Sequence, residues 1–116
     1  MRVALDIDGT ISEHPEFFSF LSNALHAQGH EIIIITYRNR SMQAITEQQM
    51  VEWAIVYHQM HFVPTLADKG RLCQELAIDV FFEDMDECIL PVGAHTIVFK
   101  TRNGFNFDFD GQQWII

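Results

Sequence analysis

Four consecutive isoleucines stand between Glu31 and Thr36, with no polar residue among them. A strand with one face in water alternates apolar and polar side chains, so this run predicts a strand that is buried on both faces. Residues 2–7, 79–84 and 96–100 are further short runs rich in apolar residues. Helical segments are expected between these runs, and strands that alternate with helices form parallel sheets covered by helices on both faces. The sequence therefore predicts an α/β fold.

The segments between the strands show helical spacing. Pro15 suits the first position of a helix and Gly29 suits a C-terminal cap. The stripe between them consists of Phe17, Leu21, Ala24, Leu25 and Gln28, widened by Phe18. Residues 41–60 predict one long helix. Its expected buried face is Met42, Ile45, Trp53, Tyr57 and Met60. A short strand at 62–63 and a helix at about 69–77 are expected next.

The end of the chain has a different pattern. Residues 105–109 alternate with a period of two, and they meet residues 112–116 across the dipeptide Asp110-Gly111. An Asp-Gly pair between two such segments is a strong turn signal. The sequence therefore predicts a C-terminal β-hairpin.

Length, charge and cysteine usage limit the class of protein. A chain of 116 residues is expected to form a single domain, residues 1–116. Its net charge of −9 disfavours nucleic-acid polymers and anionic membranes as partners. No apolar stretch approaches the roughly 18 residues that span a bilayer, and the N-terminus lacks the layout of a signal peptide. Cys73 and Cys88 make no disulfide framework. We expect a cytoplasmic protein.

Polar residues follow the predicted strands at their carboxyl ends. Asp6 and Asp8 lie at the end of the first run, Thr36 ends the second, and Glu83 and Asp84 end another. In parallel sheets these ends share one edge, where ligands bind. Carboxylates so close together cannot all ionise freely, so a cation or a shared proton is expected. Oxygen ligands of this kind suit a hard cation such as Mg²⁺.

Each of these side chains has a chemical role that its type permits. The Asp6 carboxylate is a candidate nucleophile toward phosphorus, and Asp8 is a candidate general acid and base. The Thr36 hydroxyl can donate to a phosphoryl oxygen. The Lys69 ammonium can hold phosphoryl oxygens and offset the carboxylates.

Basic residues gather beside these positions although the chain is acidic. Arg38 and Arg40 follow Thr36, and Arg71 follows Lys69. This distribution favours a small anionic ligand. A guanidinium offers a planar fork for phosphate or carboxylate, so we expect Arg38 and Arg40 to contact the substrate.

The run from Asp6 to Thr10 resembles the first motif of the haloacid dehalogenase superfamily of phosphohydrolases, Asp-x-Asp-x-Thr. Thr36, Lys69 and the pair Glu83-Asp84 match its second, third and fourth motifs in order, so the resemblance covers roughly residues 2–100. It implies a Rossmann-like three-layer α/β/α fold with a parallel sheet, and an aspartyl-phosphate intermediate.

The resemblance also implies a cofactor and a substrate class. Mg²⁺ would be held by Asp6, the backbone carbonyl of Asp8 and Asp84, with Glu83 as a ligand or an outer partner. The substrate would be a small phosphorylated metabolite, and similarity to small nucleotidase-like members makes a nucleotide one candidate. The expected activity is Mg²⁺-dependent hydrolysis of a phosphate ester.

The chain departs from the family in ways that bear on specificity. Members usually carry a squiggle and flap after the first motif, and often a cap domain. About four residues separate Thr10 from Pro15, and nothing between Tyr37 and Lys69 is long enough for a folded cap. A capless site is open unless another copy covers it as a homo-oligomer. Two alternatives stay open: a regulatory phospho-acceptor domain and a non-catalytic phosphate-binding domain.

Overall fold

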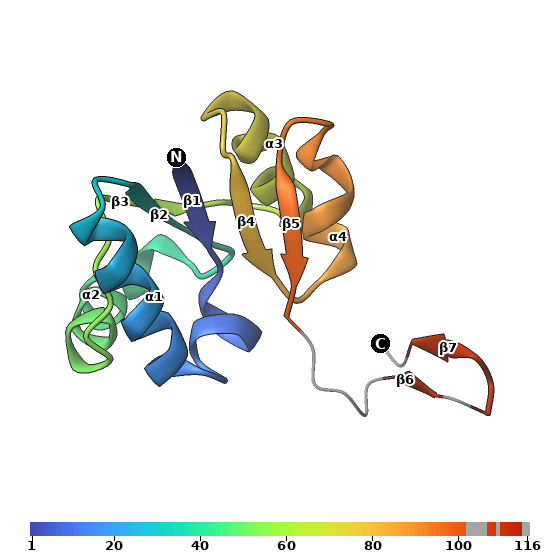
Figure 1. Ribbon diagram of the computed structural model, residues 1–116, viewed down its shortest axis with the longest axis horizontal. Coiled ribbons are helices and arrows are strands. Elements are labelled where there is room, and N and C mark those ends of the chain that lie inside the picture. Colours follow the sequence, from blue (N-terminus) through green and yellow to red (C-terminus); the bar gives the residue numbers. More distant parts are fainter. Residues whose placement is uncertain (102–106, 109, 115–116) are drawn as a thin grey trace.

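The computed structural model describes residues 1–101, 107–108 and 110–114. Its main sheet has five strands in the order β3-β2-β1-β4-β5, and every neighbouring pair is parallel. Figure 1 shows these strands side by side, with their carboxyl ends at one edge. The strands are β1 (Arg2–Leu5), β2 (Glu31–Thr36), β3 (Gln59–Phe62), β4 (Val80–Glu83) and β5 (Ile97–Lys100).

Helices cover both faces of this sheet. They are α1 (Pro15–Ala27), α2 (Gln43–Glu52), α3 (Leu66–Glu75) and α4 (Asp86–Ile89). Three short helical turns complete the described segments: η1 (Ile7–Ile11), η2 (Arg40–Met42) and η3 (Leu90–Val92). The arrangement is a Rossmann-like three-layer α/β/α fold, which confirms the fold predicted from the sequence.

Two apolar clusters form the core, one on each face of the sheet. Val3 and Leu5 of β1 pack with Phe18 of α1 and Met50 of α2. Ala4 between them faces the other way and packs in the second cluster. That cluster also holds Ile33, Ile35, Cys73 and Phe81. Successive side chains of a strand point to opposite faces, so β1 and β2 are buried on both sides. This explains the unbroken isoleucine run.

The first helix has the predicted bounds but a shifted buried face. It begins at Pro15, and Gly29 beyond its end has a φ of +80°, a backbone conformation that glycine adopts readily. Phe18 and Ser22 are its buried residues. Phe17, the first member of the predicted stripe, is 53 % exposed. Leu21 and Leu25 of the predicted stripe do pack against the core, whereas Ala24 and Gln28 are exposed.

The prediction of one helix over 41–60 is wrong. The helix α2 ends at Glu52, Ala54 takes a positive φ of 55°, and the chain then enters β3. The reason is tertiary pairing, because residues 59–62 pair with β2 and complete its hydrogen bonds on that side. The buried face of α2 is made by Thr46 and Met50.

Helix α3 begins three residues earlier than predicted. The Thr65 hydroxyl accepts a hydrogen bond from the Asp68 backbone N–H at 3.2 Å, which is a typical N-terminal cap. Lys69 therefore lies in the second turn of α3, not at its start. At this position the Lys69 side chain reaches the carboxyl ends of the strands, where it pairs with Asp6 and Glu83.

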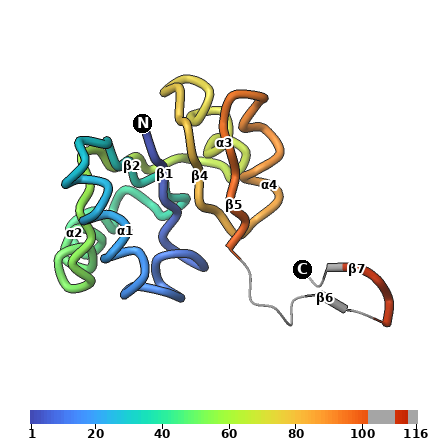
Figure 2. The backbone as a smooth tube through the Cα atoms, in the orientation of Figure 1, coloured from blue at the N-terminus to red at the C-terminus, as the bar shows by residue number. Residues whose placement is uncertain are grey.

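A short antiparallel pair closes the described chain, as predicted. Strands β6 (Phe107–Asp108) and β7 (Gln113–Trp114) pair with Phe107 opposite Trp114. Figure 2 draws the backbone of the fold as a tube, coloured along the sequence. The outer parts of the predicted hairpin, at residues 105–106, 109 and 115–116, lie outside the described residues.

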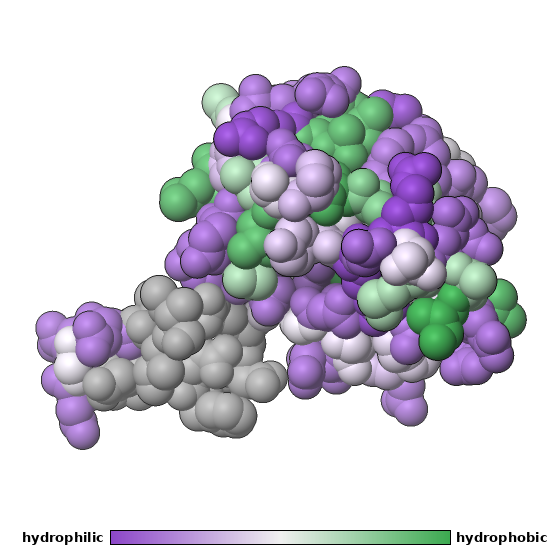
Figure 3. All heavy atoms as spheres, turned by 180° about the vertical axis from the view of Figure 1, so that it is seen from behind, coloured by the Kyte–Doolittle hydropathy of each residue, from purple (hydrophilic) through white to green (hydrophobic). Residues whose placement is uncertain are grey.

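The surface of the described chain is mostly polar on the face drawn in Figure 3. Hydrophilic residues predominate there, and hydrophobic residues form separate patches. None of the described helices combines the length and the apolar character needed to cross a membrane.

Candidate active site

A wide turn directly after β1 shapes the site. The backbone N–H of Ser12 donates to the carbonyl of Ile7 at 3.0 Å, so the turn spans five residues instead of four. Within it Gly9 has a φ of +87°, and a Cβ atom there would collide with the Asp84 carboxylate. A glycine is therefore required both by the backbone and by the close approach of Asp84.

Asp6 lies at the start of this turn and is held by one side chain of the turn itself and by one from helix α3. The residue is buried, with 2 % of its surface exposed. The Thr10 hydroxyl donates to Oδ2 at 2.9 Å, and the Lys69 ammonium forms an ion pair with Oδ1. Because both oxygens are hydrogen-bonded, the carboxylate has a defined orientation.

Glu83 holds the same lysine from the neighbouring strand β4. Lys69 Nζ lies 3.0 Å from Glu83 Oε2, and both side chains are buried. The other oxygen, Oε1, accepts hydrogen bonds from the backbone N–H groups of Asp84 and Met85 at 3.2 and 3.3 Å. Both oxygens of Glu83 therefore have protein partners.

The charges of this cluster do not balance. Burial raises the pKa of Asp6 to about 6, against the opposing effect of Lys69. Burial, and then the charge of Asp6, raises the pKa of Glu83 to about 8. Burial acts to lower the pKa of Lys69, but the charges of Asp6 and Glu83 outweigh it and raise that pKa. The single positive charge of Lys69 therefore cannot neutralise both buried carboxyl groups, those of Asp6 and Glu83, if both ionise.

Asp84 completes a group of acids with the geometry of a cation site. One carboxylate oxygen from each of Asp6, Glu83 and Asp84 lies within 4.8 Å of the other two. Asp84 Oδ1 is buried and has no hydrogen-bond partner among the described residues. A buried carboxylate oxygen without a partner is costly, and a hard cation with oxygen ligands would remove that cost. These residues therefore fit Mg²⁺.

Asp8 is placed near the same group but pairs with an arginine. Arg38 donates from Nε and from a terminal nitrogen to the two oxygens of Asp8, at 2.9 and 2.8 Å. The same guanidinium also donates to Thr46 and Gln49 of α2. The hydrogen bonds from Arg38 hold the pKa of Asp8 below its ordinary value. Arg38, predicted to bind substrate, is thus already engaged by Asp8.

Thr36 lies in the same pocket as the acids, and Arg40 does not. A pocket of about 330 Å³ is lined by Asp6, Asp8, Thr36, Tyr37, Arg38, Leu66, Lys69, Glu83 and Met85. The Thr36 hydroxyl accepts a hydrogen bond from the Arg38 backbone N–H at 3.1 Å, which leaves its own proton available to another acceptor. Arg40 lines a neighbouring hollow.

Thr101 is part of the site and was missed from the sequence. Its hydroxyl lies 2.9 Å from that of Thr10, which in turn donates to Asp6. Thr101 directly follows β5, so it is a further polar residue at the carboxyl end of a parallel strand. The rule that selected Thr36 would also have selected Thr101.

Comparison with known proteins supports the fold, and the chemistry has to be inferred from the residues of the site. No protein-family model matches the sequence, and no curated protein matches it. A chain from a structure of the Pnkp1/Rnl/Hen1 complex is similar in structure, with a TM-score of 0.62 at 15 % identity. The match covers 85 % of this chain and 45 % of that one, so this chain spans less than half of its length.

A universal stress protein in complex with cAMP is also similar, with a TM-score of 0.60 at 13 % identity. That match covers 88 % of this chain and 98 % of the other. At such identities a shared fold carries no shared activity.

The raised pKa of Glu83 predicts an unusual pH dependence of stability. Its pKa of about 8 in the folded protein exceeds the ordinary value of 4.5, so the folded state binds more protons between these values. Stability should therefore rise as pH falls through about 8. We expect the metal-free protein, in a chelator, to melt a few degrees higher at pH of about 6 than at about 8.5.

The Glu83→Gln variant is the control for this effect, because the amide keeps the shape and does not titrate. Most of the pH dependence of the melting temperature should disappear in it. A parent melting temperature that is constant or falls on acidification would show that Glu83 is ionised throughout.

Proposed function

We propose that this protein is a Mg²⁺-dependent phosphatase that hydrolyses a small phosphate ester, a nucleotide being one candidate. The observation that carries the proposal is the convergence of Asp6, Asp8, Thr36 and Lys69 on one pocket. These residues come from different segments of the chain, and each has the chemistry that one step of phosphoryl transfer needs.

Asp6 is the proposed nucleophile. One carboxylate oxygen attacks phosphorus while the bond from phosphorus to the ester oxygen breaks, which leaves an aspartyl phosphate. Thr10 and Lys69 orient that carboxylate. Thr36 would donate its hydroxyl proton to a phosphoryl oxygen.

Asp8 is the proposed general acid and base. It would give a proton to the departing ester oxygen and then take one from the water that attacks the aspartyl phosphate. Its pairing with Arg38 favours the ionised form that the second step needs. For the first step the phosphoryl oxygens would compete for Arg38, so that Asp8 can carry its proton.

The cation would be held by Asp6 and Asp84 with the backbone carbonyl of Asp8. When bound, Mg²⁺ would neutralise charge that develops on the phosphoryl oxygens. Glu83, whose oxygens are used by Lys69 and by backbone N–H groups, is better suited to an outer role that keeps Lys69 beside Asp6.

The position of Asp8 favours hydrolysis over the phospho-acceptor alternative. A signalling domain needs a long-lived aspartyl phosphate, and an acid/base group in the same pocket shortens that lifetime. Asp8 lines the pocket with Asp6, and its side chain is 63 % exposed. It can therefore reach water.

A screen of phosphorylated metabolites with Mg²⁺, with the Asp6→Asn variant beside the parent, tests the proposal. Release of inorganic phosphate by the parent and not by the variant is the expected result. Stoichiometric phosphorylation of the parent without turnover would favour the phospho-acceptor alternative. Ester binding with neither reaction would favour the non-catalytic one.

The Asp8→Asn variant should discriminate between leaving groups. Alkyl phosphates need protonation of the departing oxygen, so their phosphorylation step should slow by about a hundredfold or more. Aryl phosphates have better leaving groups and should lose much less in that step. Single-turnover measurements of both ester types separate this step from the later hydrolysis. Equal losses for alkyl and aryl esters would show that Asp8 is not the acid.

A further inference from the structure

Arg40 is the one lysine or arginine among the described residues for which no ion pair is found. Arg2, Arg38, Lys69, Arg71 and Lys100 each form an ion pair with an acidic side chain. The Arg40 side chain is exposed. A chain with a net charge of −9 has many acidic side chains that could pair with an arginine. An exposed arginine that has no such ion pair and lies beside the active site is therefore suited to bind an external anion.

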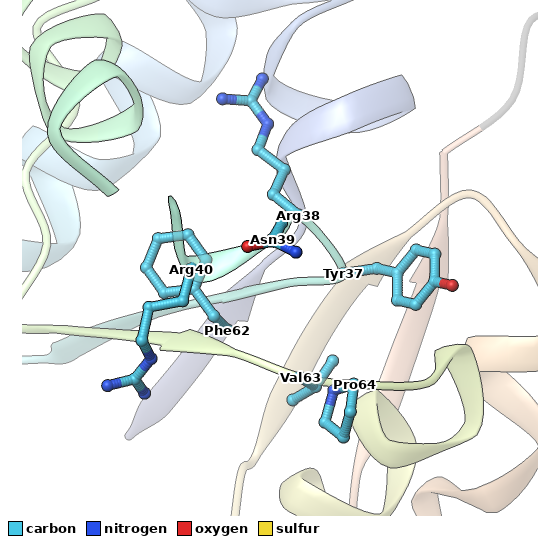
Figure 4. A pocket seen from close by; sticks show the side chains of 7 residues that line it. All are labelled: Tyr37, Arg38, Asn39, Arg40, Phe62, Val63 and Pro64. Carbon is cyan, nitrogen blue, oxygen red and sulfur yellow. The ribbon is translucent and has the colours of Figure 1, made fainter. Parts of the chain in front are cut away.

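Arg40 belongs to a hollow that adjoins the active-site pocket. The hollow has a volume of about 530 Å³, and Tyr37 and Arg38 line both spaces. In Figure 4 Tyr37 and Arg40 extend in different directions from the loop after β2. The rest of its lining is Asn39 of the same loop, Phe62 of β3 and the Val63-Pro64 segment that follows. A ligand held at Asp6 can therefore continue into this hollow.

The lining offers two kinds of recognition. Tyr37 is 53 % exposed and Phe62 is half-buried, so both can present ring surface to a flat group. Stacking of flat rings on aromatic side chains is favourable and tolerates different rings. The Arg40 guanidinium supplies a planar fork for a carboxylate or phosphate.

We infer that the hollow lined by Tyr37, Arg40 and Phe62 holds the leaving group of the ester, and that it selects a leaving group with a flat ring and a second anionic group. A nucleoside bisphosphate is one molecule of this class. The inference rests on the proposed function, because it places the scissile phosphate at Asp6. The inference gives the two arginines different roles. Arg38 pairs with Asp8, and Arg40 binds the second anionic group of the substrate.

Three esters test the inference in the full-length protein. Phenyl phosphate has the ring alone, 4-carboxyphenyl phosphate adds the second anion, and cyclohexyl phosphate has a ring that is not flat. We expect the parent to show a KM for 4-carboxyphenyl phosphate about tenfold below that for phenyl phosphate. In the Arg40→Ala variant this preference should disappear, so that the KM values for the two aryl esters lie within about twofold of each other.

Two further variants complete the design. Arg71→Ala removes the same charge, but Arg71 pairs with Asp68 and does not line the hollow, so the preference should persist in it. Tyr37→Ala should raise KM for both aryl esters more than for cyclohexyl phosphate. An equal effect of Arg40→Ala on both aryl esters, or a parent without the preference, would overturn the inference.

Failure of the proposed function itself gives a different result. If the parent hydrolyses no phosphate ester, calorimetric titration with adenosine 3′,5′-bisphosphate tests the hollow directly. Binding that weakens about tenfold in Arg40→Ala and persists in Arg71→Ala would support the anion subsite alone. No binding to the parent would overturn the subsite as well.

Discussion

The Asp6→Asn variant should lose phosphatase activity by at least about a thousandfold and keep its fold. The amide has nearly the shape of the carboxylate: its oxygen can still accept the hydrogen bond from Lys69, and its NH2 group can donate to the Thr10 hydroxyl, which donates to the carboxylate in the parent. It is a poor nucleophile, so the aspartyl phosphate cannot form. The measurement is kcat/KM with the best ester from the substrate screen, beside a melting curve that reports the fold.

Asp79→Asn is the matched control for Asp6→Asn. Asp79 lies at the opposite edge of the sheet, where its carboxylate accepts hydrogen bonds from the Arg2 backbone N–H and from His95. The same chemical change there should leave kcat unchanged. Activity of Asp6→Asn within about tenfold of the parent would exclude covalent catalysis by Asp6.

Addition of Mg²⁺ should raise the melting temperature by about 10 °C at a concentration about a hundred times Kd. The physical cause is the cluster of Asp6, Glu83 and Asp84, whose oxygens lie close together and include one with no described partner. A bound cation would remove their repulsion, so it stabilises the folded state that presents the site. Differential scanning calorimetry with and without a chelator measures the effect.

The Asp84→Ala variant should lose most of this Mg²⁺-dependent rise in melting temperature, since the substitution removes the carboxylate oxygens that Asp84 offers to the cation. Asp86→Ala is its control, because Asp86 is two residues away and pairs with Lys100. The control should keep the full rise in melting temperature. A similar rise in the parent and in Asp84→Ala would place the cation elsewhere.

The sheet was the most predictable part of the molecule. The runs at 31–36, 79–84 and 96–100 correspond to β2, β4 and β5, because a strand buried on both faces needs apolar side chains at every position. Strand β3 could not be located in the same way. Its four residues are half-buried, and its place at the sheet edge depends on pairing with β2.

The polar residues at the strand ends were also predictable as a group. Asp6, Thr36 and Glu83 each follow or end a predicted strand, and the structure brings them to one pocket. The topology of a parallel sheet is sufficient for this, because all carboxyl ends meet at one edge. The topology does not predict which of these side chains form ion pairs with one another.

What the sequence by itself determined is therefore the layered α/β fold and the set of polar side chains at one edge of the sheet. Only the tertiary structure decided their partners: Lys69 between Asp6 and Glu83, Arg38 on Asp8, and Arg40 with no ion-pair partner among the described residues. Periodicity depends on neighbours along the chain, whereas these ion pairs depend on distances of a few ångströms between residues that are 14 to 63 positions apart. Packing sets those distances.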